Sequence, residues 1–432
     1  MIDLLPYQLA GAEHLSTRTR AYLADEMGLG KTAQVIRAAD MVDAKVILIV
    51  CPACACRNWQ AEFIKFGDER RSIILDGVNF KQSSAYRVLI VSYDMLSRNK
   101  PLREYLALLK RCVTVCDEAH YLKSKKAKRT KAVFGNRLEG AARSIVGASR
   151  QVWLLSGTPI PNNASEMYAP MYGMGMIPPM TRYDAFLRQY TVGFDGPFGY
   201  KITGSQNQKQ LMALWRGNFL RRRKAEVLPD LPPITWATVV VEGKLPRGCD
   251  VPHIAGMSQA EIVDYMQQNT TGLANYRRIV GESKIKGAVD YASNELYSGC
   301  DKLVIFAHHT SVIDGLAEGL ADHNPVIFDG RTSSAVRADH ESRFRNDPTC
   351  RVFIGQLTAA GTAINLDASS RVLFVEQDWV PGNNAQAAMR VHRMTQKSPC
   401  LISFATLPDS IDEMIADAVL QKTKDIIKIL GD

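Results

Sequence analysis

The hydrophobic pattern of the chain repeats one theme in two halves. Short apolar runs of the length of buried strands alternate with segments whose apolar residues recur at helical spacing. Such alternation is typical of parallel α/β sheets. Strand-like runs of the first half lie at 21–24, 45–51, 72–75, 87–93, 111–116 and 151–155. Those of the second half lie at 302–307, 325–328, 351–355, 371–376 and 400–405.

Helical patterns separate these runs, for example at 33–44, 311–322, 335–344 and 411–430. We therefore predict an α/β fold with two RecA-like lobes, each a parallel sheet flanked by helices, and small helical protrusions. Between the halves the alternation of strand-like and helical segments weakens, and the sequence is rich in methionine, proline and basic residues. The expected division is an N-terminal lobe at 1–224 with a helical protrusion at about 160–220, a linker at 225–260 and a C-terminal lobe at 261–432.

Composition excludes several classes of protein. The chain has 432 residues, of which 46% are apolar and 22% charged, so we expect neither disorder nor a fibre. No apolar run approaches the ~20 residues that span a bilayer, and no leader pattern is present, which predicts a soluble, unexported protein without a membrane partner. The odd count of nine cysteines favours a reducing compartment over a disulfide framework.

A zinc site is the alternative interpretation of the cysteines. Cys51, Cys54 and Cys56 are close in sequence, and Cys112 and Cys116 have the right residue type to complete a site. The second pair, however, lies in an apolar run, where cysteine usually acts as a small buried hydrophobe. We favour the buried interpretation.

The strongest chemical signal is the run DEMGLGKT at 25–32, which follows an apolar run and opens a helical pattern. Glycines let backbone N–H groups approach phosphate oxygens, the lysine reaches the outer phosphates, and the threonine hydroxyl suits Mg²⁺. The strict pattern has glycine at position 25, where this chain has Asp25. The predicted nucleotide contacts are Met27, Gly28, Leu29, Gly30, Lys31 and Thr32, with ATP and Mg²⁺ as cofactors.

A second signal is the sequence DEAH at 117–120, at the end of an apolar run. The carboxyl ends of parallel strands line the ligand crevice, so both acids are expected to face the nucleotide. We predict that Asp117 holds Mg²⁺ and that Glu118 orients and deprotonates the attacking water.

A third signal lies near the end of the chain. On a helix, Gln386, Arg390 and Arg393 would share one face, because their spacings are four and three residues. Two arginines beside an amide are suited to neutralising the charge on a transferred phosphate. A solvated helix face is the ordinary alternative, and the other two motifs favour a catalytic role.

Together these residues resemble the SNF2 family of superfamily 2 DNA translocases. The segment KLVIFAHH at 302–309 is most similar to its HARP-type, annealing-helicase branch. Collinear blocks in the correct order carry the resemblance: PYQ (6–8), LADEMGLGKT (23–32), DEAHYLKS (117–124), LLSGTPIPNN (154–163), LRRRKAEVLPDLPP (220–233), FDGRTSS (328–334), DWVPG (378–382) and QAAMRVHRMTQ (386–396).

The resemblance implies further roles. Gln8 would read adenine, and Arg390 and Arg393 would be arginine fingers. Residues implied to couple hydrolysis to movement are His120, Ser156, Gly157, Thr158, Gly361 and Thr362. The chain departs from the family where Ala363 and Thr395 replace glycines, which would restrict the backbone there. Only five residues precede Pro6, so we expect a motor without the family's N-terminal accessory module.

Two basic stretches predict where DNA would bind. Residues 121–150 hold nine basic side chains and one acid, and residues 216–224 hold five basic side chains and no acid. Such cations bind phosphates without reading sequence. A solvated surface or an import signal is the alternative for KSKKAKR. The predicted DNA-binding residues are Lys123, Lys125, Lys126, Lys128, Arg129, Lys131, Arg221, Arg222 and Arg223.

These observations predict a monomeric DNA-dependent ATPase that translocates on and remodels double-stranded DNA. Strand annealing and action on branched or forked duplexes are left open. A strand-separating superfamily 2 helicase and a non-catalytic DNA-binding scaffold are the alternatives, and a P-loop kinase is disfavoured because no acceptor-site motif is evident. We expect an intracellular protein at DNA, cytoplasmic in a prokaryotic or viral setting.

Overall fold

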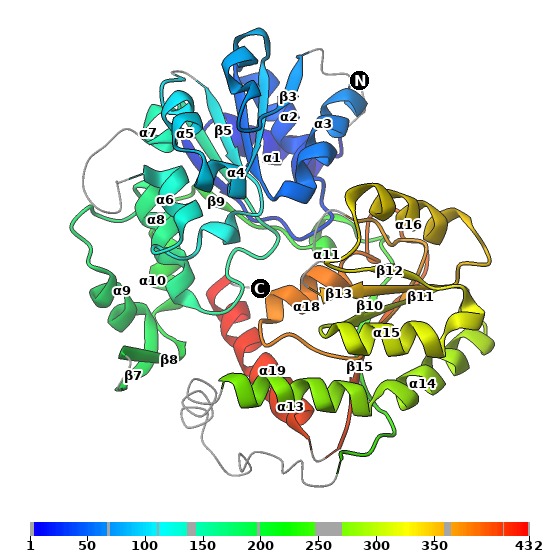
Figure 1. Cartoon of the computed structure of the whole chain (residues 1–432). Helices are drawn as coiled ribbons and strands as arrows, with labels where there is room; N and C mark the ends of the chain where they lie inside the picture. Colours follow the sequence, from blue (N-terminus) through cyan, green and yellow to red (C-terminus); the bar gives the residue numbers. More distant parts are fainter. Residues whose placement is uncertain are drawn as a thin grey trace. The chain divides into compact units, whose positions relative to one another are not determined.

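The chain forms two compact units, each with its own β-sheet (Figure 1). The computed structural model describes residues 4–66, 70–109, 112–135, 144–196, 199–246, 270–357, 364–408 and 410–430. Unit 1 comprises the chain up to residue 192, residues 204–229 and the chain from residue 425 onward. Unit 2 comprises residues 193–203 and 230–424. The division between the units at 229 and 230 falls within the segment predicted to be the linker.

Unit 1 is built on a seven-stranded sheet in the order β3-β4-β2-β5-β6-β1-β9. Each pair of neighbouring strands in it is parallel. The strands are β1 (Arg20–Leu23), β2 (Ile47–Cys51), β3 (Ser72–Ile74), β4 (Val88–Ser92), β5 (Val113–Cys116), β6 (Gln151–Leu155) and β9 (Phe219–Leu220). Each strand-like run of the first half therefore forms a strand, and of the strands in this sheet the two-residue β9 was not predicted.

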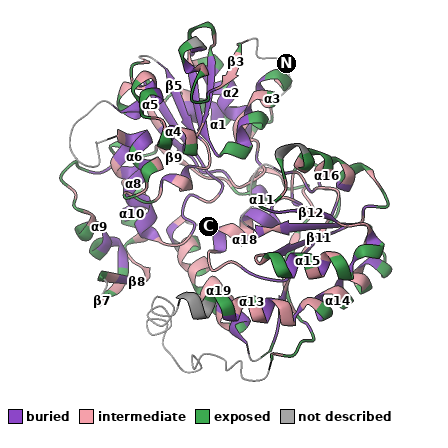
Figure 2. Ribbon diagram, viewed as in Figure 1, coloured by how far each residue is buried: buried purple, intermediate pink, exposed green. Residues whose placement is uncertain are grey.

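Helices cover both faces of this sheet, because successive strand residues point to opposite faces. In β2, Leu48 and Val50 join one hydrophobic cluster, whereas Ile47 and Ile49 join the other. The second cluster includes α1 (Pro6–Ser16), α2 (Lys31–Met41) and α3 (Cys56–Lys65). The first includes α4 (Tyr93–Arg98), α5 (Lys100–Leu106), α6 (Lys128–Phe134), α7 (Ile145–Ala148) and α8 (Tyr168–Met174). Figure 2 shows the strands buried between these layers.

The region expected to be a helical protrusion contains helices and also a two-stranded sheet. The helices are α8, α9 (Tyr183–Tyr190) and α10 (Gln208–Ala213), and the strands are β7 (Thr191–Gly196) and β8 (Gly199–Ser205). The short helix α11 (Lys224–Val227) follows β9. The strands were not predicted, because TVGFDG and GYKITGS are rich in glycine and polar residues.

Unit 2 is built on a six-stranded parallel sheet in the order β10-β15-β14-β11-β13-β12. Its strands are β10 (Ile234–Val240), β11 (Leu303–Ala307), β12 (Val326–Phe328), β13 (Val352–Gln356), β14 (Arg371–Phe374) and β15 (Cys400–Thr406). Its helices are α13 (Thr270–Ser283), α14 (Ile285–Tyr297), α15 (Thr310–Gly319), α16 (Ser334–Asn346) and α18 (Pro381–Ala388). The last helix, α19 (Ile411–Leu430), has its final residues in unit 1.

Two helix-flanked parallel sheets confirm the predicted α/β fold class. Within the described parts of the chain, no helix is both long and apolar enough to cross a membrane. In unit 1, parallel pairing puts the carboxyl ends of β1, β5 and β6 at one edge of the sheet, where a doubly wound fold binds ligands.

Candidate nucleotide-binding site and basic surface

The segment between β1 and α2 has the backbone geometry of a phosphate-binding loop. Gly28 and Gly30 have φ angles of 86° and 71°, in the left-handed region that favours glycine. Helix α2 begins directly after Gly30, so its free N–H groups and positive end are available to an anion. The ammonium group of Lys31 donates to the backbone oxygens of Asp25 at 2.8 Å and Glu26 at 3.3 Å. The lysine therefore lies folded over the loop.

The electrostatics of Lys31 connect the loop to the acids of β5. Burial lowers the pKa of Lys31, and the charges of Glu118, Asp25 and Asp117 act in the opposite direction. Thr32, the second residue of α2, is half-buried. The lysine and hydroxyl predicted to meet phosphate and Mg²⁺ thus come from the start of one helix.

Gln8 lies on α1, beside the phosphate loop. Its side chain is buried, its Oε1 accepts from the backbone N–H of Leu5 at 3.0 Å, and its Nε2 donates to the backbone oxygen of Leu29 at 3.4 Å. The glutamine thus adjoins the loop. Adenine reading by Gln8 stays a prediction.

Asp117 and Glu118 follow β5 at the carboxyl edge of the sheet. β6 lies between β5 and β1, so the two acids and the phosphate loop leave the same edge of the sheet. Glu118 has a φ of 49° and a ψ of 52°, a left-handed conformation that costs a side-chain-bearing residue energy. Strained backbone of this kind clusters at functional sites. The observed conformation supports a functional position for Glu118.

The oxygen atoms of Asp117 accept three described hydrogen bonds. The indole N–H of Trp59 donates to its Oδ2 at 2.8 Å, and the backbone N–H of Glu118 donates to its Oδ1 at 2.9 Å. The hydroxyl of Tyr93 donates to its backbone oxygen at 2.8 Å. Burial, followed by the charge of Glu118, raises the pKa of Asp117 to about 6, while the bond from Trp59 lowers it. A bound cation would favour the ionised form.

His120 connects the acids to Ser156, which directly follows β6. Its Nδ1 forms a 3.0 Å hydrogen bond with Ser156 Oγ and lies 3.3 Å from Glu118 Oε2. Ser156 is fully buried, and its Oγ also accepts from the backbone N–H of Thr158 at 3.1 Å. The structure thus brings the predicted coupling residues of unit 1 together.

Gly157 lies against the phosphate loop. A Cβ at this position would be 2.2 Å from Met27 Cγ and 3.1 Å from the Met27 backbone nitrogen. No side chain fits in that space without moving the loop. The segment after β6 and the phosphate loop are therefore in direct contact, as a coupling role requires.

Gln386, Arg390 and Arg393 do not share one helix, which corrects the prediction from their spacing. Helix α18 ends at Ala388, and the two arginines lie in the turns that follow it. Gln386 is buried. Arg393 donates to the backbone oxygen of Ile364, and burial, followed by the charge of Arg390, lowers its pKa to about 10. Their catalytic roles stay predictions.

Of the two expected departures from the family pattern, Thr395 lies within the described residues. The hydroxyl of Thr395 donates to the carboxylate of Asp367, and Thr395 is not among the described residues with positive φ. The threonine therefore adopts an ordinary backbone conformation and adds a hydrogen bond that glycine lacks. Gly361, Thr362 and Ala363 lie outside the described residues.

The described cysteines are not arranged as a metal centre. Cys51 and Cys56 sulfur atoms are 3.6 Å apart, and Cys112 contacts Thr114 and Ser149. Within the described ranges, no three His, Cys, Asp or Glu side chains are placed to hold a metal ion.

Comparison with known protein families decides the identity of this arrangement. Residues 7–243, more than half of the chain, match the SNF2-related domain, and residues 288–395 match the helicase conserved C-terminal domain. The chain belongs to the SNF2-related family.

Relatives of this SNF2-related chain include an annealing helicase, which confirms the predicted resemblance to that branch. It is 30% identical, over 99% of its length, to the SWI/SNF-related matrix-associated actin-dependent regulator of chromatin subfamily A-like protein 1 of Xenopus laevis. It is 28% identical, over 95% of its length, to the DNA annealing helicase and endonuclease ZRANB3 of Homo sapiens. The chain spans 44% and 39% of these two relatives.

A solved structure is also similar to this SNF2-related chain. It is the Sulfolobus solfataricus SWI2/SNF2 ATPase core in complex with dsDNA, which is 22% identical with a TM-score of 0.47. The match covers 100% of this chain and 94% of that chain.

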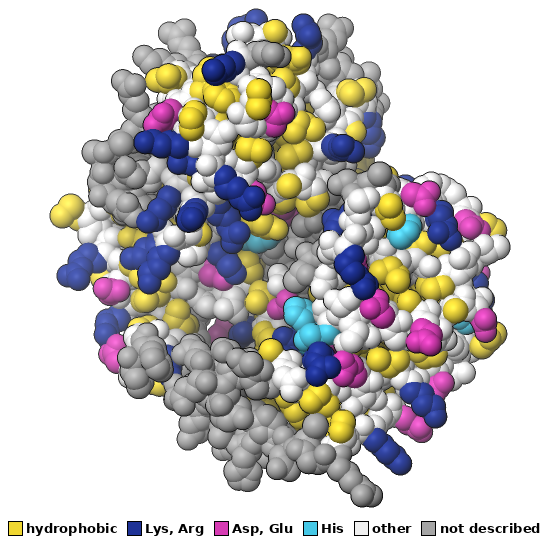
Figure 3. All heavy atoms as spheres, viewed as in Figure 1, with side chains coloured by type: hydrophobic (Ala, Val, Ile, Leu, Met, Phe, Trp, Pro, Cys, Tyr) yellow, Lys and Arg dark blue, Asp and Glu magenta, His cyan; other side chains and the backbone are white. Residues whose placement is uncertain are grey.

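The basic segment after the DEAH acids in the SNF2-related chain is partly tethered. Lys123 pairs with Glu166 at 2.7 Å, and the Lys125 ammonium lies 4.3 Å from the ring centroid of Tyr183. Arg129 Nε donates to the backbone oxygen of Tyr121 at 2.7 Å. Figure 3 shows Lys and Arg side chains gathered on this part of unit 1. The described contacts fix the direction of these cations without removing their charge.

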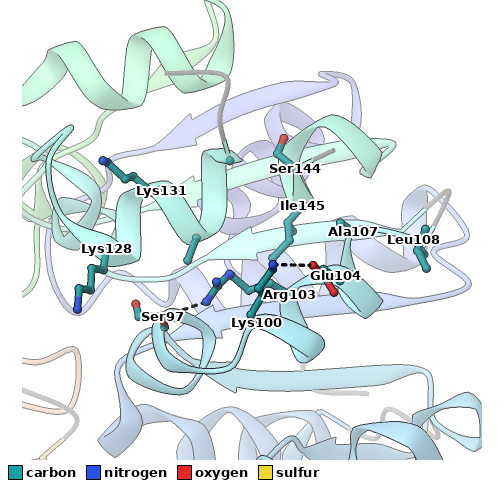
Figure 4. Close-up of a pocket in the computed structure, with 12 residues that line it drawn as sticks. Ser97, Lys100, Arg103, Glu104, Ala107, Leu108, Lys128, Lys131, Ser144 and Ile145 are labelled. Carbon is teal, nitrogen blue, oxygen red and sulfur yellow. Dashed lines mark hydrogen bonds and ion pairs between the residues drawn. The ribbon is translucent and has the colours of Figure 1, made fainter. Parts of the chain in front are cut away.

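Two further cations of the segment, Lys128 and Lys131, border a groove. Lys126 is exposed, and Lys128 and Lys131 line a groove of about 890 Å³ together with Lys100 and Arg103 (Figure 4). The Arg103 guanidinium donates to the backbone oxygens of Leu96 and Ser97, both at 2.9 Å. Glu104 is the acidic residue among those that line the groove. This surface is cationic, as contact with DNA phosphates requires.

The arginines at 221–223 are engaged inside unit 1. Arg221 donates to the backbone oxygen of Ala24 at 3.1 Å, Arg222 forms an ion pair with buried Asp25, and Arg223 pairs with Glu226 at 2.8 Å. DNA contact by these three residues stays a prediction, and the contacts of Arg222 favour an internal role.

Sequence reasoning missed Trp59 and Tyr93, which hold Asp117. Each lies on a helix that begins just after a strand, on the edge where the site forms. The polar atom of a buried aromatic residue usually finds a hydrogen-bond partner, which is the signal that could have found them.

Proposed function

We propose that this chain is a DNA-dependent ATPase that couples ATP hydrolysis to translocation on double-stranded DNA. The observation that carries the proposal is the meeting of Lys31, Asp117 and Glu118 at one edge of the unit 1 sheet. A positive phosphate loop beside two acids is the arrangement that phosphoryl transfer to water requires. Relatives that act on DNA and the cationic surface support DNA as the partner.

Mg²⁺ suits the donors present in this site. Asp117 and Thr32 offer hard oxygen ligands, and each carboxylate oxygen of Asp117 accepts one described hydrogen bond, which leaves it a lone pair. The ion would neutralise charge on the outer phosphates when bound. Lys31 would move from the loop carbonyls onto those phosphates, and Glu118 would orient and deprotonate the attacking water. Arg390 and Arg393 would neutralise charge on the transferred phosphate.

The DNA partner follows from charge and family. Lys126, Lys128 and Lys131 would contact phosphates, so affinity would fall steeply with salt. We propose action at DNA inside the cell by a monomeric motor, with strand annealing or fork remodelling as the finer activity suggested by the annealing relative.

Phosphate release with no DNA, single strands, blunt duplex and forked duplex tests the proposal. We expect duplex or forked DNA to stimulate hydrolysis well above the rate without DNA. Absence of hydrolysis under every condition would identify a DNA-binding scaffold. Displacement of a triplex strand without duplex unwinding would indicate translocation, and duplex unwinding would indicate a strand-separating helicase.

A further inference from the structure

Arg222 and Asp25 form a buried ion pair directly before the phosphate loop. Asp25 follows β1 and Arg222 follows β9, and these two strands pair in parallel. Arg222 Nε donates to Asp25 Oδ1 at 2.9 Å, and one terminal nitrogen donates to Asp25 Oδ2. Asp25 is fully buried, and the Arg222 side chain is 13% exposed. Both carboxylate oxygens are thus held by one guanidinium in bidentate geometry.

The pair extends into the loop through Gln34. Arg222 donates to Gln34 Oε1 at 2.9 Å, and Gln34 Nε2 donates to Asp25 Oδ2 and to the backbone oxygen of Leu29, both at 3.1 Å. Gln34 is fully buried on α2. The same guanidinium donates to the backbone oxygen of Tyr7, next to Gln8. One arginine therefore contacts the chain before and after the loop and the helix that carries Gln8.

Two further hydrogen bonds join the segment that contains Arg222 and Lys224 to Glu26 of the phosphate loop. The Glu26 N–H donates to the Arg222 backbone oxygen at 2.9 Å, and the Lys224 N–H donates to Glu26 Oε2 at 2.7 Å. Lys224 begins α11, shortly before the chain passes into unit 2 at residue 230. The segment by which the chain leaves unit 1 is thus bonded to both residues that open the phosphate loop.

Helix α1 packs closely against Gln34 and Arg222. A Cβ on Gly11 of α1 would lie 1.7 Å from Gln34 Oε1 and 2.6 Å from an Arg222 nitrogen. Helix α1 approaches this closely because residue 11 is glycine. Because Asp25, Arg222 and Gln34 are packed this closely, their hydrogen-bond network holds the phosphate loop in one position.

We propose that Arg222 is a positioning residue for the phosphate loop, which sets nucleotide affinity from the segment that leads to unit 2. The inference rests on the proposed use of ATP. It gives Arg222 a role different from the DNA contact predicted from its basic stretch. The side chain acts through Asp25 and Gln34, so it shapes the loop without touching the nucleotide.

A purely structural role is the rival explanation, because loss of either partner leaves the other buried and unpaired. The two explanations differ for the double variant Asp25→Asn with Arg222→Met, which removes both charges. If the pair only supports the fold, the double variant regains stability and nucleotide affinity together. If the pair positions the loop, it regains stability while its nucleotide affinity stays low.

The experiment measures KM for ATP, kcat, the Kd for duplex DNA and the thermal midpoint of the full chain. For Arg222→Met we expect KM to rise about tenfold, the loss expected for a charge-assisted hydrogen bond, with the DNA Kd and its salt dependence unchanged. Arg222→Lys keeps the positive charge but lacks the planar guanidinium that binds both carboxylate oxygens. It should recover part of the affinity for ATP. Arg70→Met is the matched control, because Arg70 pairs with Asp40 at 2.7 Å elsewhere in unit 1.

Each outcome decides the assignment. A normal KM in Arg222→Met, or a weakened DNA Kd with normal KM, overturns the positioning role. Full recovery of KM in the double variant also overturns it. If Arg222→Met does not fold, the same quantities are compared between the wild type, Arg222→Lys and the double variant. Absence of hydrolysis by the wild-type chain would instead sink the proposed function, and direct binding of ATP would still test Arg222.

Discussion

Trp59 donates a 2.8 Å hydrogen bond to the carboxylate of Asp117, across 58 residues of sequence. Trp59 is 1% exposed, so this bond is shielded from water. It lowers the pKa of a carboxyl that burial otherwise raises. Trp59 therefore favours the ionised form of Asp117, on which the proposed cation binding would depend.

Trp59→Phe should weaken the proposed binding of Mg²⁺ at Asp117. We expect the Mg²⁺ concentration at half-maximal ATPase to rise severalfold, because the carboxylate loses its N–H donor. Trp153→Phe is the control, since Trp153 is also buried but its indole N–H has no hydrogen-bond partner in the described structure. Equal Mg²⁺ curves for the two variants would contradict the assignment.

Glu118→Gln should abolish hydrolysis without loss of ATP binding, because the amide cannot take a proton from water. Lys31→Ala should instead weaken ATP binding itself. A phosphate-release assay together with a direct nucleotide-binding measurement separates the two effects. Full turnover by Glu118→Gln would remove its role as base.

Gly157→Ala should distort the phosphate loop, because the new Cβ would lie 2.2 Å from Met27 Cγ. We expect a loss of about 1–3 kcal/mol of unfolding free energy, typical of overpacking, and a large loss of ATPase activity. Gly77→Ala is the control, since its Cβ would make an ordinary 3.5 Å contact with Asn99. Denaturant unfolding and ATPase assays on both variants provide the comparison.

His14 should make the fold sensitive to acid. Burial, followed by the charge of Arg18, lowers its pKa from 6.5 to about 4, with Arg222 acting in the same direction and Asp25 in the opposite one. The unfolded chain therefore binds a proton that the folded chain rejects. Its contribution to stability is complete above pH 6.5 and is lost as the pH falls toward 4, on the order of 3 kcal/mol.

Unfolding free energies of the wild type and His14→Gln between pH 7.5 and 4 test this contribution. The difference between the two proteins isolates His14, because other titrating groups are common to both. A difference that does not change with pH would contradict it.

Lys126→Glu with Lys128→Glu should weaken DNA binding and DNA-stimulated ATPase, while the rate without DNA is retained. Each lost phosphate contact should lower the slope of log affinity against log salt by about one. Lys45→Glu is the control, since Lys45 is exposed just before β2, at the opposite edge of the sheet. Unchanged stimulation in the double variant would exclude this segment from the DNA site.

Much of the fold follows from local pattern. The mostly apolar runs at 47–51 and 113–116 form central strands, because few ways exist to bury four or five consecutive residues of this kind. The edge strand β10 was missed, since its residues are partly buried or exposed and follow a proline pair. Its place depends on pairing with β15, more than 150 residues later.

The spacing of glycines predicted the phosphate loop correctly, whereas helical spacing failed beyond the point where a helix ends. The glycines of the phosphate loop have the positive φ that their sequence predicts. The spacing of Gln386, Arg390 and Arg393 implied one helix face, but α18 stops at Ala388. Periodicity assumes that a helix continues, and the sequence there contains no marked stop signal.

The sequence by itself determined the two parallel sheets, the phosphate loop and the acids after β5, because each is encoded by neighbouring residues with restricted backbone or burial. The tertiary structure alone decided that Trp59 holds Asp117, that Gly157 touches Met27 and that Arg222 binds Asp25. These partners are between 58 and 197 residues apart. From the sequence alone, Arg222 could be described only as one cation of a basic stretch. The parallel pairing of β9 with β1 placed that charge against a buried carboxylate, where an ion pair is favoured over contact with solvent.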